Sequence, residues 1–313
     1  MNIKLFPIAR SLASYFLPSK IFKRPGSGGT FSSEYCYSVW LRHLVTLVNG
    51  GLLKNVKELN NIAEIGPGDS FGIGLAALYT GASNYFAFDV IKHSDLNRNI
   101  LINKDLLNYF KKCFDIPNGN NFKEVHPVLN DYSFPGNILT YEPDFYEQRY
   151  VAIENVLKDE KYSNIKIKYI VPWPEEENED ISNIDLIFSQ AVMEHVYDIK
   201  FAYNKMYKWL KKGGIISHQI DFKGHEITRE WNGHWFINET VWKFLMKGRK
   251  YPINRHPLSA HIKSIEDAGF KIKTIIPDHR ANTFINKAPK VINVNFTDED
   301  MITSGALIQA IKI

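Results

Sequence analysis

The sequence predicts an α/β protein with a doubly wound, mostly parallel sheet of seven strands. Three observations predict it. Short apolar runs typical of buried strands alternate with helical patterns, a glycine-rich turn joins the first strand to the next helix, and the last two strands lack a crossover helix. Because parallel neighbours need a crossover, we expect these two strands to close the sheet as an antiparallel hairpin.

Apolar periodicity places the expected elements along the chain. Residues 165–171 alternate lysine with apolar residues, which is typical of a strand at the border of a sheet, because lysine discourages edge-to-edge pairing. We expect helices near 37–48, 71–79, 101–114, 144–157, 199–210 and 258–268, and strands near 61–65, 85–88, 165–171, 184–188, 215–220, 271–276 and 305–311.

Three segments organise the chain. Residues 33–313 are expected to form one domain, which 313 residues can accommodate together with an insertion. From about 93 to 163 the pattern is polar with scattered aromatic residues, and we interpret it as a helical insertion that covers part of the site. Residues 1–32 form a basic N-terminal arm, whose first 24 residues contain five lysines and arginines and no acid.

The composition excludes several classes of function. A net charge of +4 is too small and too evenly mixed to indicate nucleic-acid binding. Two cysteines cannot build a disulfide framework, which favours a reducing compartment, the cytoplasm. No apolar run approaches the roughly 20 residues that span a bilayer. The composition of residues 1–24 also suits peripheral contact with an anionic inner membrane face, or an arm packed on the domain.

The strongest motif is residues 64–72, Glu-Ile-Gly-Pro-Gly-Asp-Ser-Phe-Gly, between an expected strand and an expected helix. Glycines let the backbone turn sharply and approach a ligand, and the N–H groups that open the helix face it. Asp89 lies 17 residues after Gly72, at the end of the second strand. A carboxylate there can accept both hydroxyls of a ribose, so the motif indicates a nucleoside cofactor.

On these pieces the chain resembles the class I S-adenosylmethionine (SAM)-dependent methyltransferases over roughly residues 35–313, apart from the insertion. The matching stretches are the glycine loop AEIGPGDSFG, the second strand YFAFDV, the segment DLIFSQAVMEHV, the turn LKKGG and the expected terminal hairpin. The resemblance implies the Rossmann-like methyltransferase fold, SAM as cofactor and methyl transfer as the reaction.

The resemblance also implies the site. The acid before the glycine loop would lie near the methionine amino end of SAM, the loop glycines would give backbone access, and the acid after the second strand would hold the ribose. The end of the fourth strand would line the methyl-transfer face. The implied cofactor-binding residues are Glu64, Gly66, Pro67, Gly68, Asp69, Ser70, Asp89, Val90, Ser189, Gln190 and Ala191. Many relatives have an acid after the third strand for the adenine. Here Val171-Pro172-Trp173-Pro174 intervenes, so the adenine contacts stay open, with Trp173 as one stacking candidate.

A narrower likeness concerns the acceptor. The stretches SHQIDFKGH and INRHPLSAHIKSIEDAGF are similar to bacterial methyltransferases of surface-polysaccharide gene clusters, which implies O-methylation of a sugar or glycan hydroxyl. An alcohol acceptor needs a general base. The candidates are His225, His195 and Asp221, with His225 preferred because it follows the fifth strand. His218 and Asp221 face opposite sides of one strand, so no metal site is predicted.

Two other functions stay open. A nicotinamide (NAD)-dependent oxidoreductase uses the same loop and acid, although Glu64, the Gly66-Pro67-Gly68-Asp69 variant and the terminal hairpin disfavour it. A non-catalytic, methyltransferase-like module in a biosynthetic complex is the second alternative. The identity of the acceptor, the oligomeric state and transfer to oxygen, nitrogen or carbon are left open.

Overall fold

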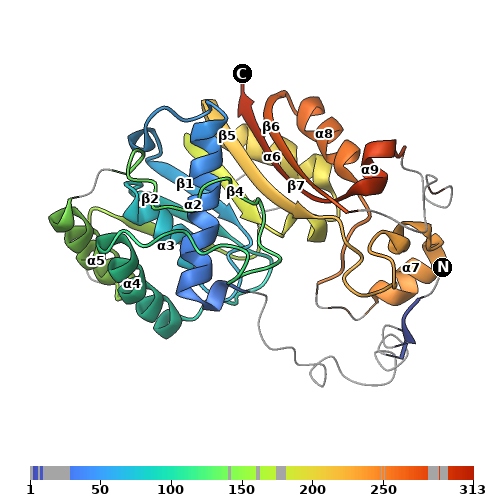
Figure 1. The fold of residues 1–313 in the computed structure, drawn as a ribbon, viewed down its shortest axis with the longest axis horizontal. Coiled ribbons are helices and arrows are strands. Elements are labelled where there is room, and N and C mark those ends of the chain that lie inside the picture. Colours follow the sequence, from blue (N-terminus) through green and yellow to red (C-terminus); the bar gives the residue numbers. More distant parts are fainter. Residues whose placement is uncertain are drawn as a thin grey trace.

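The computed structural model of the protein describes residues 3–5, 8–9, 29–139, 142–159, 163–173, 181–247, 249, 251–280, 289 and 295–313. Within these residues seven strands form one mixed sheet flanked by helices, which confirms the predicted fold class (Figure 1). The strands are β1 (Asn61–Ile65), β2 (Asn84–Phe88), β3 (Lys166–Ile170), β4 (Ile184–Gln190), β5 (Leu210–Asp221), β6 (Phe270–His279) and β7 (Thr303–Lys312).

The strand order β3-β2-β1-β4-β5-β7-β6 places β1 between β2 and β4. All three are parallel, with Glu64 of β1 opposite Ala87 and Phe188. The chain moves outward from β1 through β2 to β3 and resumes on the other side of β1 at β4. Ligands of doubly wound sheets bind at such a switch point, beyond the carboxyl ends of the strands.

The terminal strands confirm the antiparallel closure of the sheet. β7 runs antiparallel to both β5 and β6, and β3 is the edge strand that its lysines predict. β5 begins earlier than expected, at Leu210, because Leu210 already pairs with Ile184 of β4. The carboxyl ends of β5 and β6 and the start of β7 therefore meet at the edge of the sheet where β1 ends.

Helices cover both faces of the sheet (Figure 1). One core joins α2, α3, α4 and α5 to one face, and a second core joins α6 and α8 to the other. The helices are α2 (Ser33–Asn49), α3 (Gly72–Tyr79), α4 (Leu96–Lys111), α5 (Pro143–Leu157), α6 (Ile199–Trp209), α7 (Glu239–Met246), α8 (Leu258–Asp267) and α9 (Asp298–Ile302), with 3-10 turns η2 (Gly29–Phe31), η3 (Val56–Glu58), η4 (Met193–His195) and η5 (Gly233–Phe236).

The close approach of α3 to the sheet positions the glycine loop. Every residue of α3 is buried, as its small apolar sequence predicts. A Cβ on Gly74 would lie 2.1 Å from a ring atom of Tyr85 on β2, so only glycine allows the helix to pack this tightly. The first turn of α3 is thereby held beside the carboxyl end of β1.

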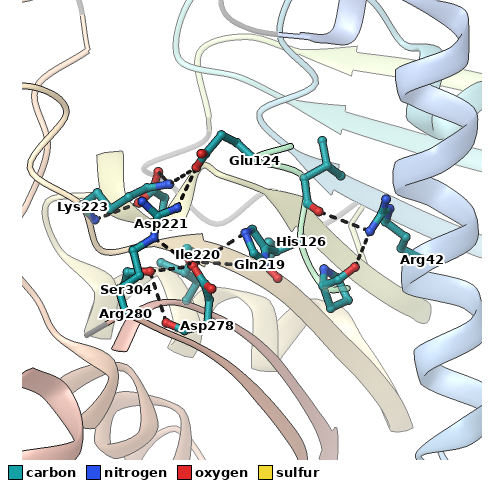
Figure 2. A network of polar contacts seen from close by, with 12 residues as sticks. Arg42, Glu124, His126, Gln219, Ile220, Asp221, Lys223, Asp278, Arg280 and Ser304 are labelled. Carbon is teal, nitrogen blue, oxygen red and sulfur yellow. Dashed lines mark hydrogen bonds and ion pairs between the residues drawn. The ribbon is translucent and has the colours of Figure 1, made fainter. Parts of the chain in front are cut away.

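The segment 93–163 contributes α4 and α5 to the first core, and the stretch between these two helices reaches the edge of the sheet where the site lies. Arg42 on α2 donates to the carbonyl oxygens of Val125 and Pro127, at 3.2 and 2.5 Å. These bonds hold residues 124–127 near the ends of β5 and β6 (Figure 2). The domain boundaries and the extent of the insertion stay predictions.

The basic arm is described only in part. Ile3 forms an antiparallel bridge with Thr228, and the N–H of Lys4 donates to the carbonyl of Ile227 at 2.9 Å. Residues 10–28, with the other four basic residues of the arm, lie outside the described residues. In the described part of the chain, no helix is both long and apolar enough to cross a membrane.

Candidate active site

The glycine loop has the backbone that its sequence predicts. Gly66 and Gly68 adopt φ values of +72° and +73°, a region that L-residues rarely occupy. A Cβ on Gly66 would lie 2.6 Å from Val192, which follows β4. The loop, including Pro67, therefore turns sharply at the end of β1 and packs closely against the segment after β4.

The N–H groups around the start of α3 are bound by the side chains of Thr30 and Asn99, which the sequence did not single out, and of Ser70, which it did. The N–H of Asp69 donates to Thr30 Oγ1 at 2.9 Å, and that of Phe71 donates to Asn99 Oδ1 at 2.8 Å. The Ser70 hydroxyl donates to the Thr30 carbonyl and accepts from the N–H of Gly72. Segments before and after the loop thus hold its far end rigid.

Glu64 is buried at the end of β1. Its Oε2 accepts a hydrogen bond from the Tyr85 hydroxyl at 2.5 Å. Burial raises the pKa of Glu64 to about 8, against the opposing effect of this bond. Glu64 is consequently a mostly neutral acid near pH 7, held against β2 and beside the glycine loop.

Asp89 lies on the neighbouring strand end, next to the loop. Its Oδ1 accepts from the N–H of Val90 at 2.7 Å. Burial raises the pKa of Asp89, and the N–H groups of Val90, Ile91 and Gly68 oppose that shift. Ile65 pairs with Phe88, and the Gly66 N–H donates to the Phe88 carbonyl at 2.7 Å, so Asp89 lies beside the glycine loop. Val90 itself is 62% exposed.

The end of β4 supplies a polar cluster. Gln190 Oε1 lies 3.3 Å from His43 Nε2 of α2, and its Nε2 donates to the His126 carbonyl at 3.3 Å. The Ser189 hydroxyl is fully buried and bonds His218 Nδ1 at 2.8 Å. Ala191 has a φ of +53°, and its N–H donates to the carbonyl of Gln219. Ser189 thus bonds inside the sheet, whereas Gln190 bridges the sheet to the segment 124–127.

The structure brings the three predicted catalytic residues together beyond β4 and β5. His225 Nε2 lies 3.6 Å from Asp221 Oδ2, and the rings of His225 and His195 meet edge to face at 5.4 Å. His225 is 31% exposed at its side chain, so a ligand can reach it. His195 Nδ1 lies 3.1 Å from the Pro252 carbonyl. Sequence reasoning had offered these residues as separate candidates.

Their electrostatic environments differ. Burial lowers the pKa of His195 to about 4, with help from nearby His225, so its imidazole is neutral at physiological pH. Burial alone would raise the pKa of Asp221, but the bond with His225 and the Lys223 ammonium lower it below its usual value. Asp221 is therefore a carboxylate that can orient His225 and stabilise its protonated form.

Glu194 is a buried neighbour of this group that sequence reasoning left without a role. Neither of its carboxyl oxygens has a hydrogen-bond partner among the described residues. Burial, followed by the negative charge of Asp221, raises its pKa well above the usual value. A neutral carboxylic acid thus lies beside the Asp221 carboxylate.

The segment 124–126 closes the far side of this region (Figure 2). Glu124 Oε2 lies 2.8 Å from Lys223 Nζ and 2.9 Å from Arg280 Nη2. His126 Nε2 lies 3.6 Å from Asp278 Oδ2 at the end of β6. Ion pairs therefore tie the predicted insertion to the same strand ends that hold Asp221.

A cleft of about 420 Å³ opens next to His225. Its wall combines basic and acidic side chains with one tryptophan. The lining residues are Lys4, Glu124, Asp221, Lys223, Gly224, His225, Glu226, Thr228, Arg229, Glu230 and Trp231.

Two other expectations concern metal and adenine. No group of three or more His, Cys, Asp or Glu side chains among the described residues could hold a metal ion. Trp173 packs against Phe88 and Trp209, which stack on each other at 4.6 Å, with its ring centroid 6.3 and 6.0 Å from theirs. Its ring is therefore engaged with the α6 side of the sheet, and its role toward adenine stays a prediction.

Comparison with known proteins gives matches to solved structures only. No family model matches the chain, and a search of curated proteins finds no match. A SAM-dependent methyltransferase from Methanosarcina mazei is 12% identical, with 85% of this chain and 97% of that chain covered and a TM-score of 0.44. A SAM-dependent methyltransferase from Mesorhizobium loti is 13% identical, with 84% of this chain and 94% of that chain covered and a TM-score of 0.38. Phosphoethanolamine N-methyltransferase 2 of Haemonchus contortus, in complex with SAM, is 16% identical, with 87% of this chain and 52% of that chain covered and a TM-score of 0.41.

Proposed function

We propose that the protein is a SAM-dependent methyltransferase. The observation that carries this proposal is the pairing of the glycine loop with Asp89 across the switch point of the sheet. Gly66 and Gly68 carry no side chain at the turn of the loop, and Asp89 follows the strand that pairs with β1 beside this loop. A nucleoside cofactor that binds over the loop donates its ribose hydroxyls to Asp89.

The residues around this crevice suit methyl transfer. SAM supplies an electrophilic methyl group on a sulfonium, so the protein needs mainly to align an acceptor with it. The segment after β4 lies against the loop, where a Cβ on Gly66 would meet Val192. The Asp221–His225 pair follows the next strand, β5, and offers a base on the acceptor side. Because Glu64 is mostly neutral near pH 7, Asp89 is the carboxylate beside the loop that can accept hydrogen bonds from the ribose hydroxyls.

The acceptor that suits the cleft is a sugar or glycan hydroxyl. Its wall offers donors and acceptors of both charge signs, and no single sign dominates it. Trp231 adds an apolar ring of the kind that packs against a sugar. His225, oriented by Asp221, removes the hydroxyl proton as the carbon–oxygen bond forms.

Calorimetric titration separates the proposal from its alternatives. Binding of SAM and its demethylated product, S-adenosylhomocysteine, without NAD supports a methyltransferase. Binding of NAD alone would establish the oxidoreductase, and binding of none of the three would leave the non-catalytic module.

Replacing Asp89 by alanine should weaken SAM binding by about 10- to 100-fold, because it removes charge-assisted hydrogen bonds to the ribose. Gly68→Val should abolish binding, since its φ of +73° and its place beside Asp89 both exclude a branched side chain. Asp267→Ala, an exposed site on α8, is the matched control and should bind normally. Normal SAM affinity in both site variants would refute the cofactor site.

The basic arm is proposed to assist contact with an anionic membrane surface. Replacing Lys20, Lys23 and Arg24 by glutamine in the full chain should weaken co-sedimentation with anionic vesicles by about fivefold per charge. Neutral vesicles serve as the control and should bind neither protein. Equal, negligible pelleting of both proteins with anionic vesicles would refute the contact.

A further inference from the structure

A short segment after α7 crosses the mouth of the cofactor crevice. The Tyr251 hydroxyl lies 2.6 Å from His93 Nε2, in the loop that follows β2. The next residue, Pro252, accepts from His195 Nδ1, in the turn that follows β4. Because β1 lies between β2 and β4, a segment that contacts both loops spans the carboxyl end of β1 and its glycine loop.

Ring contacts show where Tyr251 sits. Its ring centroid is 5.8 Å from that of His93 and 6.0 Å from that of His195. His93 is itself fixed by its N–H, which donates to the Tyr169 hydroxyl of β3 at 3.1 Å. The tyrosine ring therefore lies between the ribose side of the crevice, marked by Asp89, and the acceptor side, marked by His195.

Hydrogen bonds anchor both sides of this segment. On the β4 side, Asn254 Nδ2 donates to the carbonyls of Met193 and Val196, both at 2.8 Å, and the Asn254 N–H donates to the Glu194 carbonyl. On the β2 side, the Tyr251 hydroxyl bonds His93 Nε2 and the two rings are in contact. The bond between Tyr251 and His93 therefore ties the segment to the loop that follows β2.

We propose that residues 251–254 form a strap over the cofactor crevice, in which Tyr251 and His93 are positioning residues that latch it closed over the bound nucleoside. The proposal rests on the proposed function, because it requires a nucleoside between the glycine loop and Asp89. His93 acts through Tyr251. The other end of the strap, at Asn254, is hydrogen-bonded to the turn that carries His195. The latch therefore governs how long the cofactor stays aligned with the acceptor.

The test measures S-adenosylhomocysteine dissociation by stopped-flow fluorescence on the full chain. Tyr251→Phe keeps the ring and removes the hydroxyl, and His93→Ala removes the partner. Each should raise the dissociation rate about 3- to 10-fold, the usual effect of one lost hydrogen bond. The double variant should dissociate no faster than either single variant, because both changes open the same latch.

Tyr197→Phe is the matched control. Tyr197 follows η4 and is 87% exposed, so the same change there should leave dissociation unaltered. An unchanged or slower dissociation in Tyr251→Phe, or additive effects in the double variant, would overturn the latch and leave the proposed function standing. Failure of the parent protein to bind S-adenosylhomocysteine would overturn both.

Discussion

Replacing His225 by glutamine is expected to lower the rate of methyl transfer about 10²- to 10⁴-fold and to leave SAM affinity nearly unchanged. Glutamine keeps a polar side chain near Asp221 but cannot take the proton that an acceptor hydroxyl loses. His225 lies at the cleft and outside the glycine loop, so binding of the cofactor should not need it. Transfer from labelled SAM to cell-surface glycan precursors, in single turnover, measures the rate, and calorimetry measures affinity.

Three further variants sharpen this result. Asp221→Asn should also slow transfer, because it removes the carboxylate that orients and stabilises the His225 imidazolium. His195→Gln should cost less, since burial keeps His195 neutral and its Nδ1 already bonds Pro252. His279→Gln is the control, because His279 pairs with Glu299 at 2.6 Å. Undiminished transfer by both His225→Gln and His195→Gln, or methylation of a nitrogen or carbon, would refute the mechanism.

The fold and the cofactor side of the site could be predicted because their information is local. The glycine loop, the strand before it and the small apolar helix after it form one continuous stretch of sequence. Asp89 directly ends the next strand, and parallel pairing brings it beside the loop. Each of these features follows from periodicity and turn chemistry within about 30 residues.

The rest of the site depends on contacts between distant segments. Thr30 and Asn99 hold the glycine loop, Tyr251 meets His93, and Glu124 meets Lys223 across 99 residues. None of these side chains stands out in a periodic pattern, and α7, beside the segment that contains Tyr251, was not predicted. His225 and Asp221 were found because they flank the end of β5. The edge-to-face contact of His225 with His195 joins two segments 30 residues apart, and His225 has a φ of +43°, which its sequence does not indicate.

The free energy of unfolding should rise steeply with pH up to about 6.5 and decline gently from there to about 8. Burial lowers the pKa of seven histidines, among them His126 and His256. Five of the shifts are large: to about 4 for His43 and His195, to about 3 for His218 and His234, and well below the usual value for His261. In the unfolded chain these groups bind protons below about 6.5, and in the folded protein they do not. Their contribution is complete above pH 6.5 and is lost as the pH falls toward 4.

Two buried acids act in the opposite sense. Burial raises the pKa of Glu64 to about 8 and that of Glu194 well above its usual value. The unfolded chain releases these protons near pH 4.5, whereas the folded protein keeps them, so their contribution falls as the pH rises from about 4.5 to 8. Between pH 4.5 and 6.5 five histidines outweigh two acids, and above pH 6.5 only the acids still change the balance.

Urea unfolding at constant ionic strength tests this balance. With a net difference of up to about three protons, stability should change by at most about 4 kcal/mol per pH unit near pH 5.5, and by less at alkaline pH. Glu194→Gln keeps a neutral side chain of the same shape and should flatten the decline between pH 6.5 and 8. A stability that is greatest at pH 8 would show that the two acids are not held neutral in the fold. A stability that is constant from pH 5 to 6.5 would show that these histidines are not held neutral. In that case the claim that His195 is neutral beside His225 would be refuted as well.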